Sequence, residues 1–596
     1  MRQLEFISQA EFDEQVKAPV TAKRHYSAID VYAPYVNEMA RAEIVKQFGD
    51  EAYVRGLNVY TTVSKRLQQA ANDSIWNGLV NYDHRHGYRG IVRHIDISEI
   101  SEPESLQALL KEDERYGRFL PALIISVSDE VSTDAVVASA EDPAASIQVE
   151  KRFAVAMLKS GQQVRIPWRG IEWAREYVSV NRIGDELNKV SEVINPGDVV
   201  WLANDVSAGW SLAQIPEVQG ALVSVDPNSG AIQALTGGFD FEHSKFNRAV
   251  QAKRQAGSGF KPIVYAAALD KQYTPASLIN DAPVVFEDDA LEGAWRPENY
   301  SGKTFGPTRL RMALYKSRNL VSIRILRSIG IKHATKYAEN FGLNSSELPY
   351  DLSLALGSAE LSPLQMSRVY SVFANGGYLT EPYLIQRIED ADGSTLYEAD
   401  PAVACTACVI ARQNTSENIS EDGVLAKLPK QADRTLEPRL AFQMNSILQD
   451  VVLRGTGRRA LKLGRKDLAG KTGTTNDQRD AWFNGYNPDL VTTAWIGFDQ
   501  LKPLGNRETA AQAALPVWID FMSVALAGKP NRQLARPEGL VTLKINAETG
   551  QAATASDVDT VFEIFRKERA PSNDATAPEE QGTDGDDASA IPEQLF

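Results

Sequence analysis

Several features are absent from this 596-residue sequence, and each absence excludes a class of protein. No stretch approaches 18 uninterrupted apolar residues, and the first residues lack the basic, apolar and small-residue succession of a signal peptide. We therefore expect neither a membrane span nor a signal peptide in this chain. Lys and Arg (63) are outnumbered by Asp and Glu (78), which gives a net charge of −15, and they form no long stripe. This charge pattern argues against a nucleic-acid partner.

Cysteine is nearly absent, with only Cys405 and Cys408 in a Cys-x-x-Cys spacing. A zinc site needs about four ligands and no second pair exists, while a redox pair should open a helix after a strand, which this context does not show. A local disulfide and two idle thiols both remain open. Asp83–His86 holds two histidines in what we predict to be an exposed polar loop, too few ligands for a metal. We expect no metal and no cofactor.

What is present has the average composition of packed domains, with 43% hydrophobic and 24% charged residues, and the length predicts about three to four of them. Residues 1–55 are predicted to contain a helix at 7–16 and a connection. Residues 56–100 form a linker with a strand at 56–63 and a helix at 65–79. Residues 101–216 contain short strands separated by turns, at 122–127, 163–166 and 198–202, which favour an OB-like β-barrel insertion. This insertion is either a docking surface for another protein or a passive spacer.

Residues 217–545 have a sharper pattern. Two hairpins, at 220–235 and 481–496, enclose segments of helical periodicity around 321–329, 363–374, 444–451 and 510–526. Strands at both ends with helices between them predict an α/β fold of the α+β type, with one antiparallel sheet covered by helices on both faces. Order is expected to fade in the extension at 546–596. From about residue 571 the chain has seven acidic residues and no Lys or Arg, so we expect a disordered acidic tail.

The stretch from Ser258 to Lys261 is the first of three motifs that carry chemistry. Pro262 and the apolar run 263–269 predict a buried helix beginning near Ser258. Ser258 and Lys261 are one turn apart, so the Lys amine is within reach of the Ser hydroxyl. A serine at a helix start also lies beside the positive end of the helix dipole. The pair is therefore a candidate nucleophile with its own base.

The second motif, at Lys471–Thr475, is the most specific in the chain. We predict a strand in which Gly473 lets a ligand backbone approach closely, while Lys471, Thr472 and Thr474 meet an anion such as a carboxylate. Strand alternation does not explain how the Lys471 side chain reaches the same cavity as the two threonines.

The third motif is Ser317-Arg318-Asn319, whose Ser and Asn can serve one cavity only from a turn or loop, because a regular helix would splay them. The three motifs stand in the order found in penicillin-binding proteins and class A β-lactamases. Together with the residues around them, they closely resemble the transpeptidase module of class A penicillin-binding proteins of the 1a type. This resemblance covers residues 217–545. The family's linker is similar to residues 56–63 and 87–90, and its OB-like docking domain is similar to residues 101–216. The residues that carry it are Arg254–Pro262, Ser317–Asn319, Lys471–Asp477 and Asp480–Phe483.

The resemblance implies a D,D-transpeptidase that cross-links peptidoglycan stem peptides and is inhibited by β-lactams. Ser258 would attack the carbonyl between two terminal D-alanines and form an acyl-enzyme. Lys261 would act as a neutral base, which requires burial and a second cation, Lys471, to depress its pKa. The resemblance also implies that Ser317 relays a proton and that Asn319 binds the substrate and Lys261. Thr472 and Thr474 would bind the terminal carboxylate of the substrate. The backbone N–H groups of Ser258 and Thr474 would form the oxyanion hole.

The resemblance also implies a location at the periplasmic face of the bacterial inner membrane, with an outer-membrane lipoprotein activator as a candidate partner docking on 101–216. Family members carry a membrane anchor and a glycosyltransferase module as well. The Glu-Asp-x-x-Phe and Gly-Gly-Ser-x-Ile-x-Gln-Gln signatures of that module are absent from this sequence. We expect residues 1–55 to be a remnant of that module and a connection, and the chain not to polymerise glycan.

Three alternative functions share some of these motifs. A D,D-carboxypeptidase would use water as the acceptor, and a non-enzymatic penicillin-binding sensor or scaffold would use acylation as its signal. A serine β-lactamase needs a carboxylate that activates a deacylating water. Glu339 and Asn344 offer one, but their spacing is one residue too long for the Glu-x-x-Leu-Asn pattern.

Overall fold

The computed structural model describes residues 2, 6–17, 29–100, 102–130, 135–136, 147–148, 151–205, 209–284, 295–404 and 430–571. The chain divides into two compact units, Met1–Tyr32 and Ala33–Phe596. The first contains helix α1 (Gln9–Gln15), within the helix expected at 7–16. Cys405, Cys408 and the acidic tail beyond residue 571 lie outside the described residues. None of the helices described is both long and apolar enough to cross a membrane.

The core of the second unit is a five-stranded antiparallel sheet with strand order β13-β12-β24-β23-β22. Strands β12 (Gln219–Val225) and β13 (Ile232–Thr236) form the first predicted hairpin, and β23 (Asp480–Asn487) and β24 (Leu490–Gly497) form the second. Because β12 pairs with β24, the two hairpins join into one sheet. Strand β22 (Ala469–Thr474), which carries the Lys-Thr-Gly-Thr motif, forms one edge.

Helices cover both faces of this sheet, as predicted. Helix α9 (Pro363–Ala374) packs on one face, and α3 (Lys65–His86) and α12 (Ala514–Ala525) pack on the other. Every residue of β23 and β24 is buried, which is expected of strands enclosed on both sides. The predicted α+β layers are therefore confirmed.

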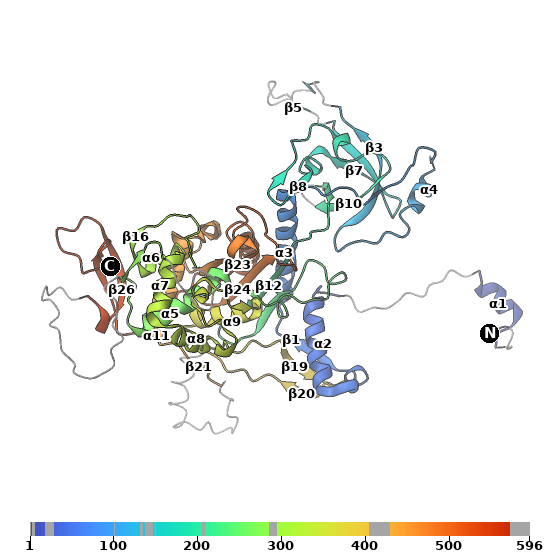
Figure 1. The fold of residues 1–596 in the computed structure, drawn as a ribbon. Helices are drawn as coiled ribbons and strands as arrows, with labels where there is room; N and C mark the ends of the chain where they lie inside the picture. Colours follow the sequence, from blue (N-terminus) through green and yellow to red (C-terminus); the bar gives the residue numbers. More distant parts are fainter. Residues whose placement is uncertain are drawn as a thin grey trace. The chain divides into compact units, whose positions relative to one another are not determined.

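A second group of helices lies beside the β22 edge. Helix α11 (Pro438–Leu453) contacts β22, and α5 (Lys261–Lys271) lies beside α7 (Asn319–Ile329) (Figure 1). The first nine residues of α5 are buried on all faces, as its uniformly apolar sequence requires. Gly330 ends α7 at a φ of 86°, as predicted for this stop.

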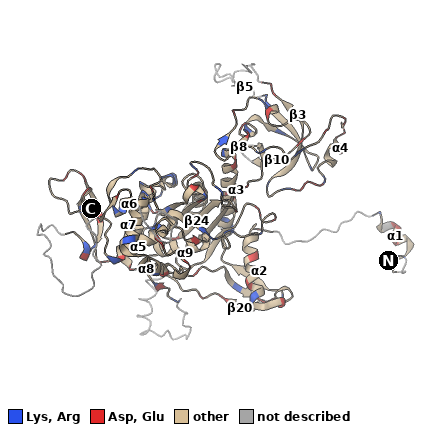
Figure 2. Cartoon of the chain, in the orientation of Figure 1, with Lys and Arg blue, Asp and Glu red and all other residues tan. Residues whose placement is uncertain are grey.

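The linker strand β1 (Asn58–Thr61) pairs with β19 (Ile385–Glu389), and α3 follows it. The insertion is an antiparallel sheet with its own apolar core, which includes Ile124, Ile166 and Leu202. Its strands are β2 (Arg93–His94), β3 (Leu120–Ser128), β6 (Phe153–Leu158), β7 (Gln163–Pro167), β10 (Asp198–Asp205) and β11 (Gly209–Ala213). The three strands predicted at 122–127, 163–166 and 198–202 are confirmed. Figure 2 shows Lys and Arg interspersed with Asp and Glu along the ribbon.

For residues 546–571, the described part of the extension, the expected loss of order is wrong. Strand β25 (Leu540–Asn546) pairs along its whole length with β26 (Thr560–Arg566). The carboxylate of Glu563, fully buried, accepts hydrogen bonds from Arg311 at 2.8 and 2.6 Å, and Arg311 also donates to Asp450 at 3.0 Å. The hairpin thus belongs to the folded core. Its partners are far away in the chain, so local composition did not reveal it.

The prediction of an exposed loop at Asp83–His86 is also wrong, because these residues form the last turn of α3. Asp83 is buried and accepts hydrogen bonds from Arg89 at 3.1 and 2.7 Å. The buried His86 ring stacks on Tyr82 with centroids 4.0 Å apart. These polar residues are used in packing between the linker helix and its neighbours.

Candidate active site

Ser258 lies in a 3-10 turn, Gly257–Gly259, directly before α5. The α-helix begins at Lys261, later than the sequence predicted, because the N–H groups of Gly259 and Phe260 form 3-10 bonds to the carbonyls of Ala256 and Gly257 instead of α-helical ones. The N–H of Gly257 donates to the carbonyl of Gly357 at 3.0 Å, and the Tyr370 hydroxyl donates to the carbonyl of Gly259 at 2.8 Å. Bonds to two different segments thus fix the backbone on either side of Ser258.

The Lys-Thr-Gly-Thr strand lies directly against this turn. A Cβ atom on Gly473 would lie 2.6 Å from the carbonyl oxygen of Ala256 and 3.1 Å from the nitrogen of Gly259. A Cβ on Gly257 would lie 2.8 Å from the carbonyl oxygen of Thr474. Only glycine permits backbones to approach this closely. The Lys-Thr-Gly-Thr strand and the start of the Ser-x-x-Lys helix therefore lie together, as the predicted active site requires.

A buried ion pair anchors the segment before the turn to the sheet. Arg254 Nε donates to Asp480 Oδ1 at 2.7 Å, and the indole N–H of Trp495 donates to the same oxygen at 2.9 Å. The indole N–H of Trp482 donates to the carbonyl of Gln255 at 2.9 Å. Removing one member of a buried pair costs about 3–5 kcal/mol, so this contact strongly constrains the start of the motif.

The Ser-x-Asn motif forms the turn that its spacing required. Ser317 has a φ of 60°, and Asn319 is the first residue of α7. A left-handed conformation costs a non-glycine residue roughly 1–2 kcal/mol, so surrounding contacts must stabilise it. The turn allows the carbonyl and hydroxyl of Ser317 and the amide of Asn319 to serve the same cluster.

Two buried lysines connect the three motifs. Lys261 Nζ donates to the Ser317 carbonyl at 3.0 Å and to Asn319 Oδ1 at 2.7 Å. Lys471 Nζ donates to Ser317 Oγ at 2.9 Å and to the carbonyl of Thr472 at 2.9 Å. Both lysine side chains are fully buried. Residues as far apart in the chain as Lys261 and Lys471 are thus bonded into one cluster.

Burial depresses the pKa of both amines. Desolvation, followed by repulsion from Lys471, holds the pKa of Lys261 well below its usual 10.5, and Asp281 partly opposes this. Burial lowers the pKa of Lys471 to about 7. Both amines therefore lose their protons at a lower pH than an exposed lysine does, and the repulsion between them favours the state in which only one of the two is charged.

The two threonines of the strand make different contacts. The hydroxyls of Thr472 and Thr456 lie 2.6 Å apart, and the N–H of Ala510 donates to Thr474 Oγ1 at 3.0 Å. Thr456, Asp281 and Asn299 were not predicted from the sequence, and the last two are buried side chains behind the Ser-x-Asn turn. None of the three belongs to a recognisable motif, so only their positions in the fold identify them.

The carboxylate considered for a β-lactamase is used elsewhere. Glu339 accepts hydrogen bonds from Lys336 at 2.5 Å and from the Ser345 hydroxyl at 2.7 Å. Asn344 accepts the N–H of Ser346 at 3.1 Å and caps the short helix η7 (Ser345–Glu347). The contacts of both residues are thus local and lie at the protein surface.

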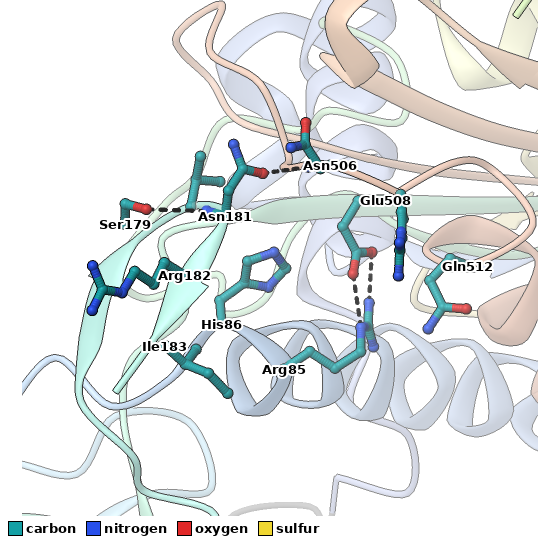
Figure 3. Close-up of a pocket in the computed structure, with 11 residues that line it drawn as sticks. Arg85, His86, Ser179, Asn181, Arg182, Ile183, Asn506, Glu508 and Gln512 are labelled. Atoms are coloured by element: carbon teal, nitrogen blue, oxygen red, sulfur yellow. Dashed lines mark hydrogen bonds and ion pairs between the residues drawn. The ribbon is translucent and has the colours of Figure 1, made fainter. Parts of the chain in front are cut away.

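A cavity of about 500 Å³ lies between three elements (Figure 3). They are the end of α3, the loop 506–512 and the insertion's hairpin of β8 (Tyr177–Ser179) and β9 (Arg182–Ile183). Arg85 donates to Glu508 through two bonds of 2.9 and 2.8 Å. The N–H of Asn506 donates to Asn181 Oδ1 (Figure 3). The insertion is therefore bonded to the loop that leads to Ala510.

Comparisons with known proteins agree with this geometry. The family described as "Penicillin binding protein transpeptidase domain" matches residues 220–502, and the "Penicillin-binding protein OB-like domain" matches 88–218. Fold and site together therefore define a serine transpeptidase of the penicillin-binding class.

Individual relatives identify the type of penicillin-binding protein within this class. Penicillin-binding protein 1A of Pseudomonas aeruginosa is 43% identical over 592 residues, which cover 96% of this chain and 69% of the relative. The Escherichia coli K12 protein of the same name is 36% identical over 606 residues, covering 93% and 69%. A 2.6 Å crystal structure of penicillin-binding protein 1A from Haemophilus influenzae has a TM-score of 0.80 and 32% identity, and covers 96% of this chain and 81% of that one.

The chain belongs to the class A penicillin-binding proteins of the 1A type. It is a serine-type D,D-transpeptidase of peptidoglycan synthesis, whose ligands are peptidoglycan stem peptides and β-lactams.

Proposed function

We propose that Ser258 is the acylated nucleophile and that Lys261 is its base. The observation that carries this proposal is the pair of buried lysines, each bonded to the Ser317–Asn319 turn: Lys261 follows Ser258 by one turn of chain, and the strand of Lys471 lies against the turn that contains Ser258. The neutral amine of Lys261 accepts the Ser258 proton as the oxygen attacks the carbonyl between the two terminal D-alanines. The peptide C–N bond then breaks, and the last D-alanine leaves as an amine while the Ser258 ester remains.

The second half of the proposed reaction transfers the acyl group. Before this transfer, Ser317, which accepts a hydrogen bond from Lys471, relays the proton that Lys261 took from Ser258 to the leaving amine, so that Lys261 is neutral again. An amine of a neighbouring stem peptide attacks the ester and gives its proton to Lys261, and Ser258 regains a proton as the new amide forms. Peptide amines thus compete with water for the acyl-enzyme, which distinguishes this reaction from a carboxypeptidase.

The remaining proposed roles concern binding. The hydroxyls of Thr472 and Thr474 and the Lys471 ammonium bind the terminal carboxylate, while the Asn319 amide holds the substrate backbone. The N–H groups of Ser258 and Thr474 form the oxyanion hole, where each donor contributes about 3–4 kcal/mol to transition-state stabilisation. The support for this arrangement is the close approach of β22 to the Ser258 turn.

We further propose that the insertion at 101–216 docks an outer-membrane lipoprotein activator and that the protein works at the periplasmic face of the inner membrane. A path of contacts supports an active insertion rather than a passive spacer. Asn181 on the insertion bonds Asn506, and the same loop continues to Ala510, whose N–H bonds Thr474. A partner that moves the β8–β9 hairpin would therefore change the position of Thr474.

Labelling with a fluorescent penicillin tests the central proposal. We expect a long-lived adduct that mass spectrometry locates on Ser258, absent from Ser258→Ala and retained in Ser346→Ala, an exposed serine outside the cluster. Both variants should unfold at the same temperature as the wild type. Label retained in Ser258→Ala would refute the assignment, and turnover of the adduct within seconds would favour a β-lactamase.

A further inference from the structure

Helix α7 begins at Asn319 without a cap of its own, because Arg318 at the N-cap position makes no side-chain hydrogen bond to the helix. The first N–H groups of a helix need an external acceptor. Asn299, in the segment before β16 (Gly306–Arg309), supplies it: its Oδ1 accepts the N–H of Asn319 at 2.8 Å. The cap is therefore provided by a distant residue that is only 6% exposed.

The orientation of the Asn299 amide is fixed by its other bonds. Its Nδ2 donates to Asp281 Oδ1 at 2.7 Å and to the Lys303 carbonyl at 2.9 Å. A carboxylate and a carbonyl only accept hydrogen bonds, so the amide oxygen must face α7. A reversed amide would lose both donors and the cap, and Asp281 therefore selects the orientation in which Asn299 supports Asn319.

Asp281 ends strand β15 (Leu278–Asp281) and is fully buried. Its Oδ2 accepts no hydrogen bond from the described residues, and the Nε atom of Arg318 lies 3.7 Å away. The groups that face this carboxylate are Lys261 and Tyr265 on α5 and Arg318 and Arg324 on α7, with Lys471 of β22 beyond Lys261. Its charge favours the protonated form of Lys261, against the larger effects of burial and Lys471.

We propose that Asn299 and Asp281 are positioning residues for acylation: they fix the Ser317–Asn319 turn so that Ser317 faces Lys471 and Asn319 faces Lys261. The proposal rests on the proposed function of those residues. Ser317 has an unfavourable positive φ, so the turn persists only where neighbouring contacts determine it. Without the cap, the first turn of α7 relaxes and Asn319 Oδ1 leaves its 2.7 Å contact with Lys261.

The first test is Asn299→Ala in the full chain, with the second-order rate of acylation by fluorescent penicillin as the readout. We expect a loss of about tenfold or more, because sub-ångström misplacement of catalytic groups costs on that order. Asn344→Ala is the matched control, since Asn344 also caps a helix, η7, but is exposed and outside the cluster. It should acylate at the wild-type rate.

The second test is Asp281→Asn, which retains an oxygen for the Asn299 amide and removes only the charge. Acylation requires neutral Lys261, so the rate falls on the acid side as that amine gains a proton. Because Asp281 raises the pKa of Lys261, its removal should move the acid limb of the pH–rate profile to lower pH. A role in stability alone would lower the melting temperature and leave the limb in place.

The outcomes separate this inference from the proposed function. Wild-type acylation by Asn299→Ala, with the adduct on Ser258, would overturn the positioning role and leave the function intact. If Asn299→Ala does not fold, Asp281→Ala decides, because it removes the bond that orients the Asn299 amide, and acylation at the wild-type rate then overturns the positioning role. An adduct on a residue other than Ser258 in the wild type would instead refute the function on which the inference rests.

Discussion

Replacing Gly473 by alanine tests the close approach of strand β22 to the nucleophile turn. The new Cβ would lie 2.6 Å from the Ala256 carbonyl oxygen and 3.0 Å from the Cβ of Trp482. An ordinary contact between a Cβ and a carbonyl oxygen needs about 3.4 Å. Because the Ala256 oxygen and the Trp482 Cβ are held by the backbone and cannot turn aside, the strand itself must move by roughly 0.8 Å. Strain of this kind costs typically about 1–3 kcal/mol of stability.

The displacement acts on catalysis more than on stability. It moves Lys471 and Thr474 away from Ser258 by a distance comparable with the 1 Å misplacement that costs up to about 100-fold. We expect the acylation rate of Gly473→Ala to fall by about 10- to 100-fold. Stopped-flow measurement of fluorescent penicillin binding gives this rate, and thermal unfolding gives the stability.

Gly170→Ala, in the insertion, is the control matched for the size of the clash. Its Cβ would lie 2.5 Å from the Trp210 carbonyl oxygen and 2.9 Å from the Ser211 Cα, both within the insertion and away from the nucleophile turn. We expect a comparable loss of stability with acylation within about threefold of the wild type. Equal acylation by Gly473→Ala and the wild type would refute the close-approach argument, as would equal losses in the two variants.

Three further outcomes are expected. The acylation rate should follow a bell-shaped pH profile, measured by stopped flow at each pH. Protonation of Lys261 sets the acid limb, and loss of charge from Lys471 sets the alkaline limb near pH 7. Glu563→Ala should lower the free energy of unfolding by about 3–5 kcal/mol in denaturant titrations, because it leaves a buried guanidinium without its main partner. Asn181→Ala should leave the unfolding temperature within a few degrees and reduce the effect of a bound activator on the acylation rate.

A specific experimental result would contradict each of these expectations. An acylation rate that rises steadily through pH 7 would contradict the charge assigned to Lys471. Unchanged unfolding of Glu563→Ala would mean that β26 is not part of the folded core, with the exposed Glu548→Ala as its control. An unaltered activator response in Asn181→Ala would exclude the path through loop 506–510.

The sequence by itself determined the layers of the fold and the motifs. Alternating apolar residues and turn chemistry predicted the hairpins of β12–β13 and β23–β24, and 3.6-residue periodicity predicted α7 and α9, because these patterns are local and recur within one element. Local chemistry also indicated Ser258, Lys261 and Lys471 as candidate catalytic groups, and the two-residue spacing of Ser317 and Asn319 required a turn.

Only the tertiary structure decided how these groups meet. The hydrogen bonds from the two lysines to the Ser317–Asn319 turn, the cap that Asn299 gives to α7, and the contact between Thr456 and Thr472 all join residues that no local pattern connects. The burial of Glu563 in β26 was missed for the same reason, since its partner Arg311 lies far away in the chain. A side chain's environment, and with it the pKa of a buried lysine, is set by whichever distant segments pack around it.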